Sequence, residues 1–148
     1  MAKNQQLPAG ENERSAADSG IYVVGDDSIA IGLARKLADR TPTVFVSADD
    51  SFAEAAERAD LDARRADVTD PWSLDTVGIR GADTVVAASR RDDRNILTAQ
   101  IVRTRFDVDD VVVRLDDPTN SDAFDDIDVR TVCLTSVLAN EIADQLTQ

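Results

Sequence analysis

A glycine followed by two aspartates separates a hydrophobic strand from a helical pattern near the start of the sequence. The segment reads VVGDDSIAIG, residues 23–32. A strand, a glycine and a helix in this order direct the unpaired N–H groups of the first helical turn at one point, where proteins bind phosphate groups. A turn that binds a dinucleotide carries small residues at three positions. Gly25 meets the first requirement and Ala30 the third, whereas Asp27 stands at the second.

Asp27 has two interpretations. A carboxylate is favoured at the start of a helix, where it contributes typically about 1 kcal/mol by accepting backbone N–H bonds. A phosphate would take the same bonds, and the carboxylate adds negative charge where a pyrophosphate would lie. Asp27 therefore either caps the helix and closes the turn, or points away while a neighbouring arginine offsets its charge.

The end of the second predicted strand bears on the same question. The sequence there is TVFVSADD, residues 43–50. A dinucleotide fold places an acid about 20 residues after the turn, where it accepts hydrogen bonds from the ribose hydroxyls. Ser47 stands at that position, and Asp49 follows as a candidate substitute. A hydroxyl binds a ribose less strongly than a charged acceptor does, so weak ribose binding is expected.

Groups for acid–base or nucleophilic catalysis are scarce. The chain has no histidine, so its single cysteine, Cys133, has none to activate it. Tyr22 is the only tyrosine, and no lysine follows it at the one-turn spacing of short-chain oxidoreductases. The sequence therefore predicts a binding protein rather than an enzyme, with no metal site. Cys133 is expected to be a small buried hydrophobic residue, and a lone cysteine excludes an internal disulfide.

Short β-branched runs alternate with helical patterns from residue 21 onward. The predicted strands are Ile21–Val24, Thr43–Val46, Ala63–Arg65, Thr84–Ala87, Val111–Leu115 and Val129–Leu134. The predicted helices are Ser28–Ala38, Phe52–Arg58, Trp72–Val77, Asp93–Phe106, Asn120–Asp125 and Ser136–Leu146. This alternation predicts an α/β fold, a Rossmann-like three-layer domain with a six-stranded parallel sheet. The uniformly apolar strands indicate a sheet covered on both faces.

The two ends of the chain differ from this pattern. Residues 1–20 show no apolar periodicity and are predicted to form a mobile tail. The last predicted helix carries Val137, Leu138, Ile142 and Leu146 close to one face. This face either packs on its own sheet or covers a second subunit, and the sequence leaves both arrangements open.

Charge and hydropathy restrict the partners. The 148 residues carry a formal net charge of −13, which repels phosphodiester backbones and argues against nucleic acid. The acidic, lysine-poor composition is expected of a halophilic protein that stays soluble in high salt, where charge repulsion is screened. No apolar run is long enough to cross a bilayer and no basic-then-apolar leader opens the chain. A cytoplasmic location is therefore expected.

Four later segments occur in a familiar order and spacing: RRADVTDP (64–71), ADTVVAASRRDDRN (82–95), VVVRLDDP (111–118) and VCLTSVLANEIA (132–143). Together they resemble the N-terminal nucleotide-binding domain of the Trk-type potassium-uptake regulators, also called the RCK or KTN domain. The resemblance covers about Ile21 to Leu146. It implies a Rossmann-like sensor that binds NAD(H) or adenine nucleotides and controls a potassium channel or transporter.

The resemblance also implies positions for the ligand site. It assigns the phosphate turn to Gly25, Asp27 and Ala30, and the ribose site to Ser47 and Asp49. It places Asp67 and Thr69 on the adenine side and Ala88 and Ser89 in the wall of the pocket. Asn95 would start the next helix, and Arg114 would lie near the phosphates. Asp67 and Thr69 have a second interpretation, in which they only hold their own loop. For Arg114 the second interpretation is a pair with an acid such as Asp116.

The last helix, from Ser136 onward, resembles the family's crossover helix, which pairs subunits. The resemblance thus implies one domain over residues 21–148, a homodimer, and a membrane potassium transporter or channel subunit as partner. The sequence departs from the family pattern at Asp27, at Ser47 and at Ala66, which replaces a glycine. These departures predict a regulatory domain that binds nucleotide weakly or not at all and acts through protein contacts.

Two alternatives remain open from the sequence. In the first, the domain is a working NAD(H) or ATP/ADP sensor, and Arg114, or Arg90 and Arg91, offsets the charge of Asp27. In the second, the protein is an NAD-dependent oxidoreductase. The second alternative is weaker because the sequence offers no candidate acid, base or substrate domain for the reaction.

Overall fold

The computed structural model describes residues 20–147, so the predicted tail lies outside the described residues apart from Gly20. The strands are β1 (Ile21–Gly25), β2 (Thr43–Ser47), β3 (Asp62–Arg65), β4 (Thr84–Ala88), β5 (Asp110–Leu115) and β6 (Arg130–Cys133). The α-helices are α3 (Ser28–Ala38), α4 (Asp50–Arg58), α5 (Pro71–Thr76), α6 (Asp92–Thr104) and α7 (Leu134–Leu146). Two 3₁₀-helices, η1 (Ile79–Gly81) and η2 (Pro118–Phe124), complete the described elements.

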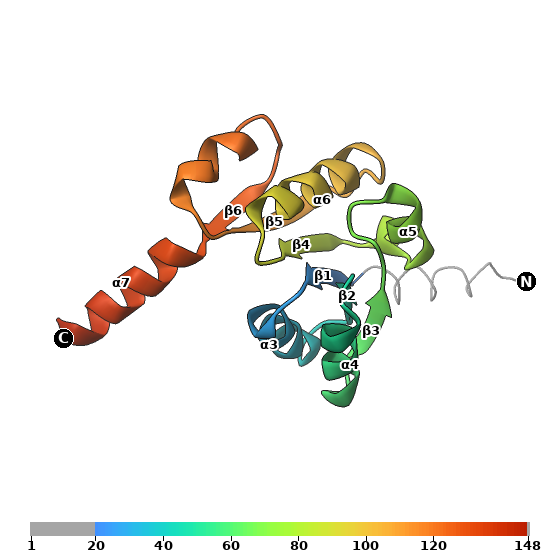
Figure 1. Cartoon of the computed structure of the whole chain (residues 1–148), viewed down its shortest axis with the longest axis horizontal. Coiled ribbons are helices and arrows are strands. Elements are labelled where there is room, and N and C mark those ends of the chain that lie inside the picture. Colours follow the sequence, from blue (N-terminus) through green and yellow to red (C-terminus); the bar gives the residue numbers. More distant parts are fainter. Residues whose placement is uncertain (1–19, 148) are drawn as a thin grey trace, which may run out of the picture.

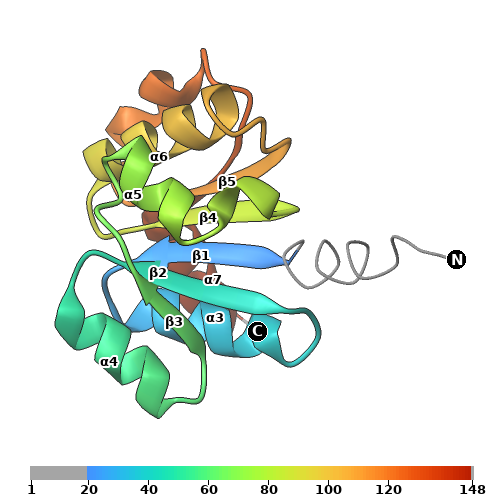
Figure 2. The same ribbon diagram turned by 90° about the vertical axis from the view of Figure 1, so that its right-hand side faces the viewer.

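All six strands of the described sheet run parallel, in the order β3-β2-β1-β4-β5-β6. Figure 2 shows this order from β3 through β1 to β5. Tyr22 of the central strand β1 lies opposite Val44 of β2 and Val85 of β4. The connections leave β1 toward β2 and return to β4 on its other side, so the loops after β1 and β4 diverge and leave a crevice between them. The predicted α/β, Rossmann-like fold with a six-stranded parallel sheet is confirmed.

Helices cover both faces of the sheet to different extents. On one face α3 and α4 approach β1 and β2 closely, because Ala30, Ala34 and Ala56 are small and fully buried there. On the other face α5 and α6 bury larger side chains such as Leu74 and Val102. Each square ångström of apolar surface removed from water contributes roughly 25 cal/mol to this packing. The two layers hold the carboxyl ends of the strands in fixed positions.

One part of the sheet has no helical cover among residues 20–147. Helix α6 follows β4 and η2 follows β5, and both pack on the same face of the sheet. The opposite face of β4 to β6 is an apolar groove of about 480 Å³, bounded by α3 and the start of α7. The prediction of a sheet covered on both faces is wrong for this half, because α7 extends away from the body of the domain instead of packing back on it (Figure 1).

The structure corrects three further predictions. The helix predicted at 120–125 is the 3₁₀-helix η2, which begins at Pro118 after Asp117 caps it and closes with short-range bonds such as Asn120 N–H to the Asp117 carbonyl at 2.9 Å. The last helix begins at Leu134, two residues before the predicted start. Cys133 is half-exposed rather than buried, since it ends the edge strand β6 beside the uncovered groove.

Candidate functional site

The crevice between the ends of β1 and β4 contains the predicted phosphate turn. β1 ends at Gly25, which is buried. A Cβ atom on Gly25 would lie 2.3 Å from the Ala30 Cβ and 3.1 Å from the Ala88 carbonyl oxygen. Gly25, Ala30 and Ala88 therefore form the tight strand–helix contact of a nucleotide turn, and no larger residue fits at Gly25.

Asp27 fills this turn with its own carboxylate. One carboxylate oxygen accepts the Ala30 N–H at 3.0 Å and caps α3. The other lies 2.9 Å from an Arg114 guanidinium nitrogen. The two features that the sequence set against each other thus occur together, because Asp27 caps the helix while an arginine offsets its charge. The Asp27 carboxylate thus accepts an N–H group that a phosphate bound at this helix start would otherwise take.

Arg114 reaches the turn from β5 on the far side of β4. Its guanidinium also bonds both oxygens of Asp116, at 2.8 and 3.1 Å, and donates to the Ala88 carbonyl at 3.2 Å. Burial lowers the pKa of Arg114, but the hydrogen bonds to Asp116 and Asp27 outweigh it, so the net shift is upward. Arg114 is therefore a permanent cation whose charge is shared between two acids.

Asp26 has a structural role that the sequence reasoning missed. Its carboxylate accepts the Ser89 hydroxyl and the Arg90 N–H, both at 2.9 Å, and its side chain is 14% exposed. The Arg90 guanidinium lies 3.5 Å from the same carboxylate. Arg90 thus offsets Asp26 and not Asp27, and the contacts tie the loop after β1 to the loop after β4.

Asn95 and Asp92 fix the backbone around the crevice. The α6 helix begins at Asp92, so Asn95 belongs to its first turn instead of starting it. The Asn95 side chain is buried, donates to the Ser89 and Arg114 carbonyls and accepts the Ser89 N–H, each at 2.9 Å. Asp92, also missed from the sequence, accepts the Asp116 N–H at 2.8 Å. Both side chains therefore use their polar groups to bond the backbone around the crevice.

The predicted ribose position at the end of β2 carries no carboxylate. Ser47 is fully buried, and its hydroxyl accepts the Asp49 N–H at 3.1 Å. Asp49 caps α4, where one oxygen accepts the Ser51 N–H at 2.9 Å and the Ser51 hydroxyl at 2.7 Å. These bonds, with that from the hydroxyl foremost, lower the pKa of Asp49. Ser47 and Asp49 therefore bond their own loop.

Asp67 and Thr69 hold the loop after β3. One Asp67 oxygen accepts the Thr69 hydroxyl at 2.7 Å and the Thr69 N–H at 3.0 Å. The hydroxyl contributes most to lowering the pKa of Asp67, and the charge of Arg94 adds a smaller effect. Both residues are exposed, so their geometry agrees with the loop-holding interpretation.

A polar cavity of about 440 Å³ opens beside the turn. It is lined by Asp26, Ala48, Asp49, Arg90, Arg91 and Arg94. Arg91 is paired with Asp93 at 2.9 Å, so it does not offset Asp27. Arg94 was missed from the sequence, although RRDDRN carries three arginines in six residues. A narrower hollow lined in part by Val24, Gly25 and Val68 shares Asp26, Ala48 and Arg94 with this cavity.

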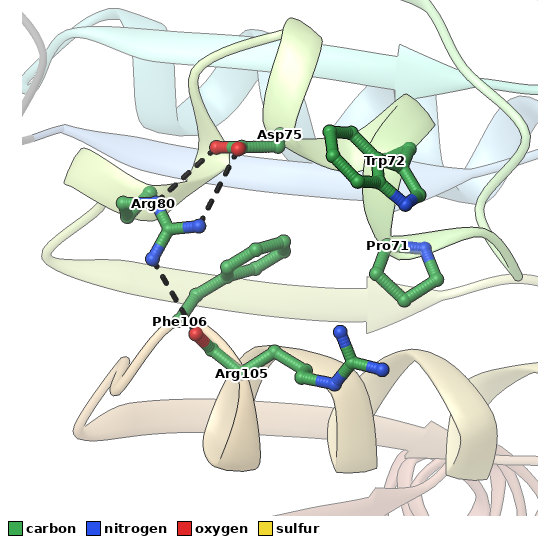
Figure 3. Close-up of a pocket in the computed structure, with 6 residues that line it drawn as sticks. All are labelled: Pro71, Trp72, Asp75, Arg80, Arg105 and Phe106. Carbon is green, nitrogen blue, oxygen red and sulfur yellow. Dashed lines mark hydrogen bonds and ion pairs between the residues drawn. The ribbon is translucent and has the colours of Figure 1, made fainter.

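A separate small hollow of about 140 Å³ lies between α5 and the segment that ends α6 (Figure 3). Within it Arg80 bonds Asp75 at 3.2 Å and lies over the Phe106 ring at 4.7 Å. Arg80 is thus a structural cation at the side of the core.

Residues 20–147 contain no group of acidic or cysteine side chains placed to hold a metal ion. Over the same span, no helix combines the length and apolarity that a membrane crossing needs.

Comparison with known sequences decides the family. Residues 21–135 match the sequence model of the TrkA-N domain. The chain belongs to the TrkA-N domain family. The Trk system potassium uptake protein TrkA of Streptomyces coelicolor is 27% identical over 130 residues, which cover 85% of this chain and 57% of that protein. This TrkA-N chain therefore spans little more than half the length of that relative. The family resemblance inferred from the sequence is confirmed.

Solved structures share the fold of this TrkA-N domain. An NAD(P)-binding domain of an exopolyphosphatase-related protein from Archaeoglobus fulgidus aligns with a TM-score of 0.75 and 23% identity, covering 85% of this chain and 96% of that one. The GsuK RCK domain aligns at 0.72 with 23% identity, over 86% of this chain and 28% of that one. The TrkA-N domain of an inner membrane protein from Escherichia coli aligns at 0.71 with 12% identity, over 85% and 95%. At these identities the likeness shows the fold alone.

Proposed function

We propose that this TrkA-N domain is a regulatory, non-catalytic part of a potassium transport system, and that its phosphate turn is closed from within by Asp27. Membership of the family and the likeness to a Trk potassium uptake protein support the transport role. The contact of Asp27 with the Ala30 N–H and the Arg114 guanidinium carries the second part. We place the domain on the cytoplasmic side of a membrane transporter or channel subunit.

The closed turn makes NAD(H) a weak ligand. A pyrophosphate would have to displace the Asp27 carboxylate from the helix start, or place its own negative charge next to that carboxylate. Arg114 offers it little help, because Asp27 and Asp116 already share that guanidinium. The alternative of a working NAD(H) or ATP/ADP sensor uses Arg114 to offset Asp27, and a GsuK channel bound to NAD contains a domain of the same fold. An oxidoreductase would still need an acid or base in a chain without histidine.

Calorimetric titration of the wild type and of Asp27→Gly with NADH, ATP and ADP tests the closed turn. We expect Asp27→Gly to bind NADH at least about tenfold more tightly, since the change frees an N–H group and removes a like charge. Asp60→Gly is the matched control, because it removes the same charge at an exposed residue whose φ of 65° suits glycine. Micromolar binding of NADH by the wild type would contradict the proposal.

We also propose that two copies form a homodimer in which α7 of each lies in the apolar groove of the other. Val137, Leu138 and Ile142 of α7 are about half exposed, at 52%, 55% and 51%. The groove on the sheet is lined mostly by aliphatic side chains and is open to a helix from outside. The first turn of α7 lines its own groove, but the rest of the helix extends away from the body of the domain (Figure 1). A second copy therefore supplies an apolar helix for the remaining surface.

Light scattering over a range of protein concentrations tests the dimer. We expect a dimeric wild type and a monomeric Leu138→Glu variant, since a charge placed in an apolar contact must be desolvated. Asn140→Glu is the control, because it adds the same charge to the other side of α7 and should leave the dimer intact. A wild type that stays monomeric at high concentration would refute the arrangement.

A further inference from the structure

Three arginines from one short segment converge on the crevice at the end of β2. Arg90, Arg91 and Arg94 line the polar cavity of about 440 Å³ together with Ala48, and only two acids, Asp26 and Asp49, line it with them. The narrower hollow that adjoins it runs over Val24, Gly25 and Val68. A cationic rim beside a partly apolar floor suits a nucleoside that carries a phosphate.

The three arginines differ in whether an acid pairs with their charge. Arg90 is paired with Asp26 at 3.5 Å, and Arg91 with Asp93 at 2.9 Å. The half-exposed Arg94 side chain forms no hydrogen bond or ion pair with any other residue of the described chain. Its guanidinium therefore offers several N–H donors in a fixed planar array, which matches the oxygens of a phosphate group.

The position of this arginine beside the end of β2 bears on ligand choice. In Rossmann-like folds an acid at the end of this strand binds the free 2′-hydroxyl of the adenosine ribose, whereas a nearby arginine accommodates a 2′-phosphate. Here the acid is replaced by Ser47, which is fully buried and bonds its own loop. Asp49 caps α4 with one of its oxygens. The crevice thus combines a missing acid with an arginine that has no side-chain hydrogen bond or ion pair among residues 20–147 and whose charge has only a small effect on Asp67.

We propose that the crevice binds adenosine nucleotides that carry a phosphate on the 2′ oxygen of the ribose, in preference to those without it, through Arg94 assisted by Arg91. This inference rests on the proposed function, since it assigns the ligand class of the same nucleotide-binding fold. It does not require the turn at Asp27 to open, because the 2′-phosphate lies at the ribose end of the crevice.

Titration with two isomers of equal charge tests the inference at constant salt. The isomers 2′-AMP and 5′-AMP differ only in the position of the phosphate, so the part of their difference in affinity that the variant Arg94→Gln removes reports the ribose end of the crevice. We expect 2′-AMP to bind about tenfold more tightly than 5′-AMP, and NADP⁺ more tightly than NAD⁺, because each charge-assisted hydrogen bond has a large effect. Inorganic phosphate, used as a third probe, should bind more weakly than 2′-AMP.

Single substitutions test whether Arg94 causes the preference for 2′-AMP. Arg94→Gln should bring the affinity for 2′-AMP to that for 5′-AMP, and Arg35→Gln, at an exposed position on α3, should leave the ratio unchanged. Ala48→Asp, at an exposed residue that lines the cavity, should lower the affinity for 2′-AMP by adding a repelling carboxylate.

Equal affinities for 2′-AMP and 5′-AMP in the wild type, binding of inorganic phosphate as tight as that of 2′-AMP, or no binding of 2′-AMP at millimolar concentration would each overturn the inference. The proposed function fails on a different result, namely micromolar binding of NADH by the wild type.

Discussion

Replacement of Arg114 by methionine is expected to lower the free energy of unfolding by about 3 kcal/mol, because removal of one partner leaves a largely buried charge without compensation. The side chains of Arg114 and Asp27 are only 10% and 14% exposed. Asp116 loses a two-point contact in the same substitution. Chemical denaturation at constant salt measures the loss, with the same slope expected for both proteins if the denatured state is unchanged.

Two companion variants make the result specific. Arg130→Met removes an arginine from the neighbouring strand β6, where Arg130 pairs with Asp110 at the surface, and should cost no more than about 1 kcal/mol. Asp27→Asn keeps a side chain that can cap α3, so Arg114→Met should cost less in its presence than in the wild type. An Arg114→Met variant as stable as Arg130→Met would show that the link between β5 and the turn contributes little.

Gly25→Ala is the second substitution with a large expected effect. The added Cβ would approach the Ala30 Cβ to 2.3 Å and the Ala88 carbonyl to 3.1 Å. Neither contact involves a flexible side chain that could move aside, so the helix or strand must shift. Such overpacking costs typically about 1–3 kcal/mol and occasionally more, and we expect about 3 kcal/mol here. Thermal unfolding followed by circular dichroism would report the loss.

Helix α3, which contains Ala30, offers a matched control. Gly32 lies within α3, and a Cβ there would have no neighbour within 4 Å. Gly32→Ala should therefore raise stability by roughly 0.5–1 kcal/mol, since alanine has the better helix propensity. The double variant Gly25→Ala, Ala30→Gly removes the closer clash and should recover part of the loss. A Gly25→Ala protein as stable as the wild type would contradict the packing described for the turn.

The sequence predicted the alternation of strands and helices and the six-stranded parallel sheet, because local patterns determine both. Ser28–Ala38 was predicted to the residue, since Asp27 and the apolar spacing mark its start and extent. The directions of side chains were not predictable in this way. Asp26 and Asp27 are adjacent and chemically identical, yet Asp26 bonds the loop after β4 while Asp27 pairs with Arg114, 87 positions along the chain. Only the strand order brings such distant partners together.

The exposure of Cys133 could not be predicted for a related reason. The segment TVCL reads as a buried strand from its residue types. Whether a strand is buried depends on what covers it, and the cover of β6 depends on the path that the chain takes after residue 133. In this structure α7 leaves the sheet, so an apolar sequence stays half-exposed.

In the proposed dimer, the extended helix α7 couples local folding to assembly. None of its residues from 134 to 146 is buried within the described chain. Isolated helices shorter than about 12–15 residues are marginal in water, so in the proposed dimer α7 takes most of its stability from the surface that it covers in the other copy. The helicity of this segment and the association of subunits then form one equilibrium, which shifts with protein concentration by mass action. A dilute monomer would expose a frayed C-terminal segment to proteases, so cleavage there would report the assembly state of the protein.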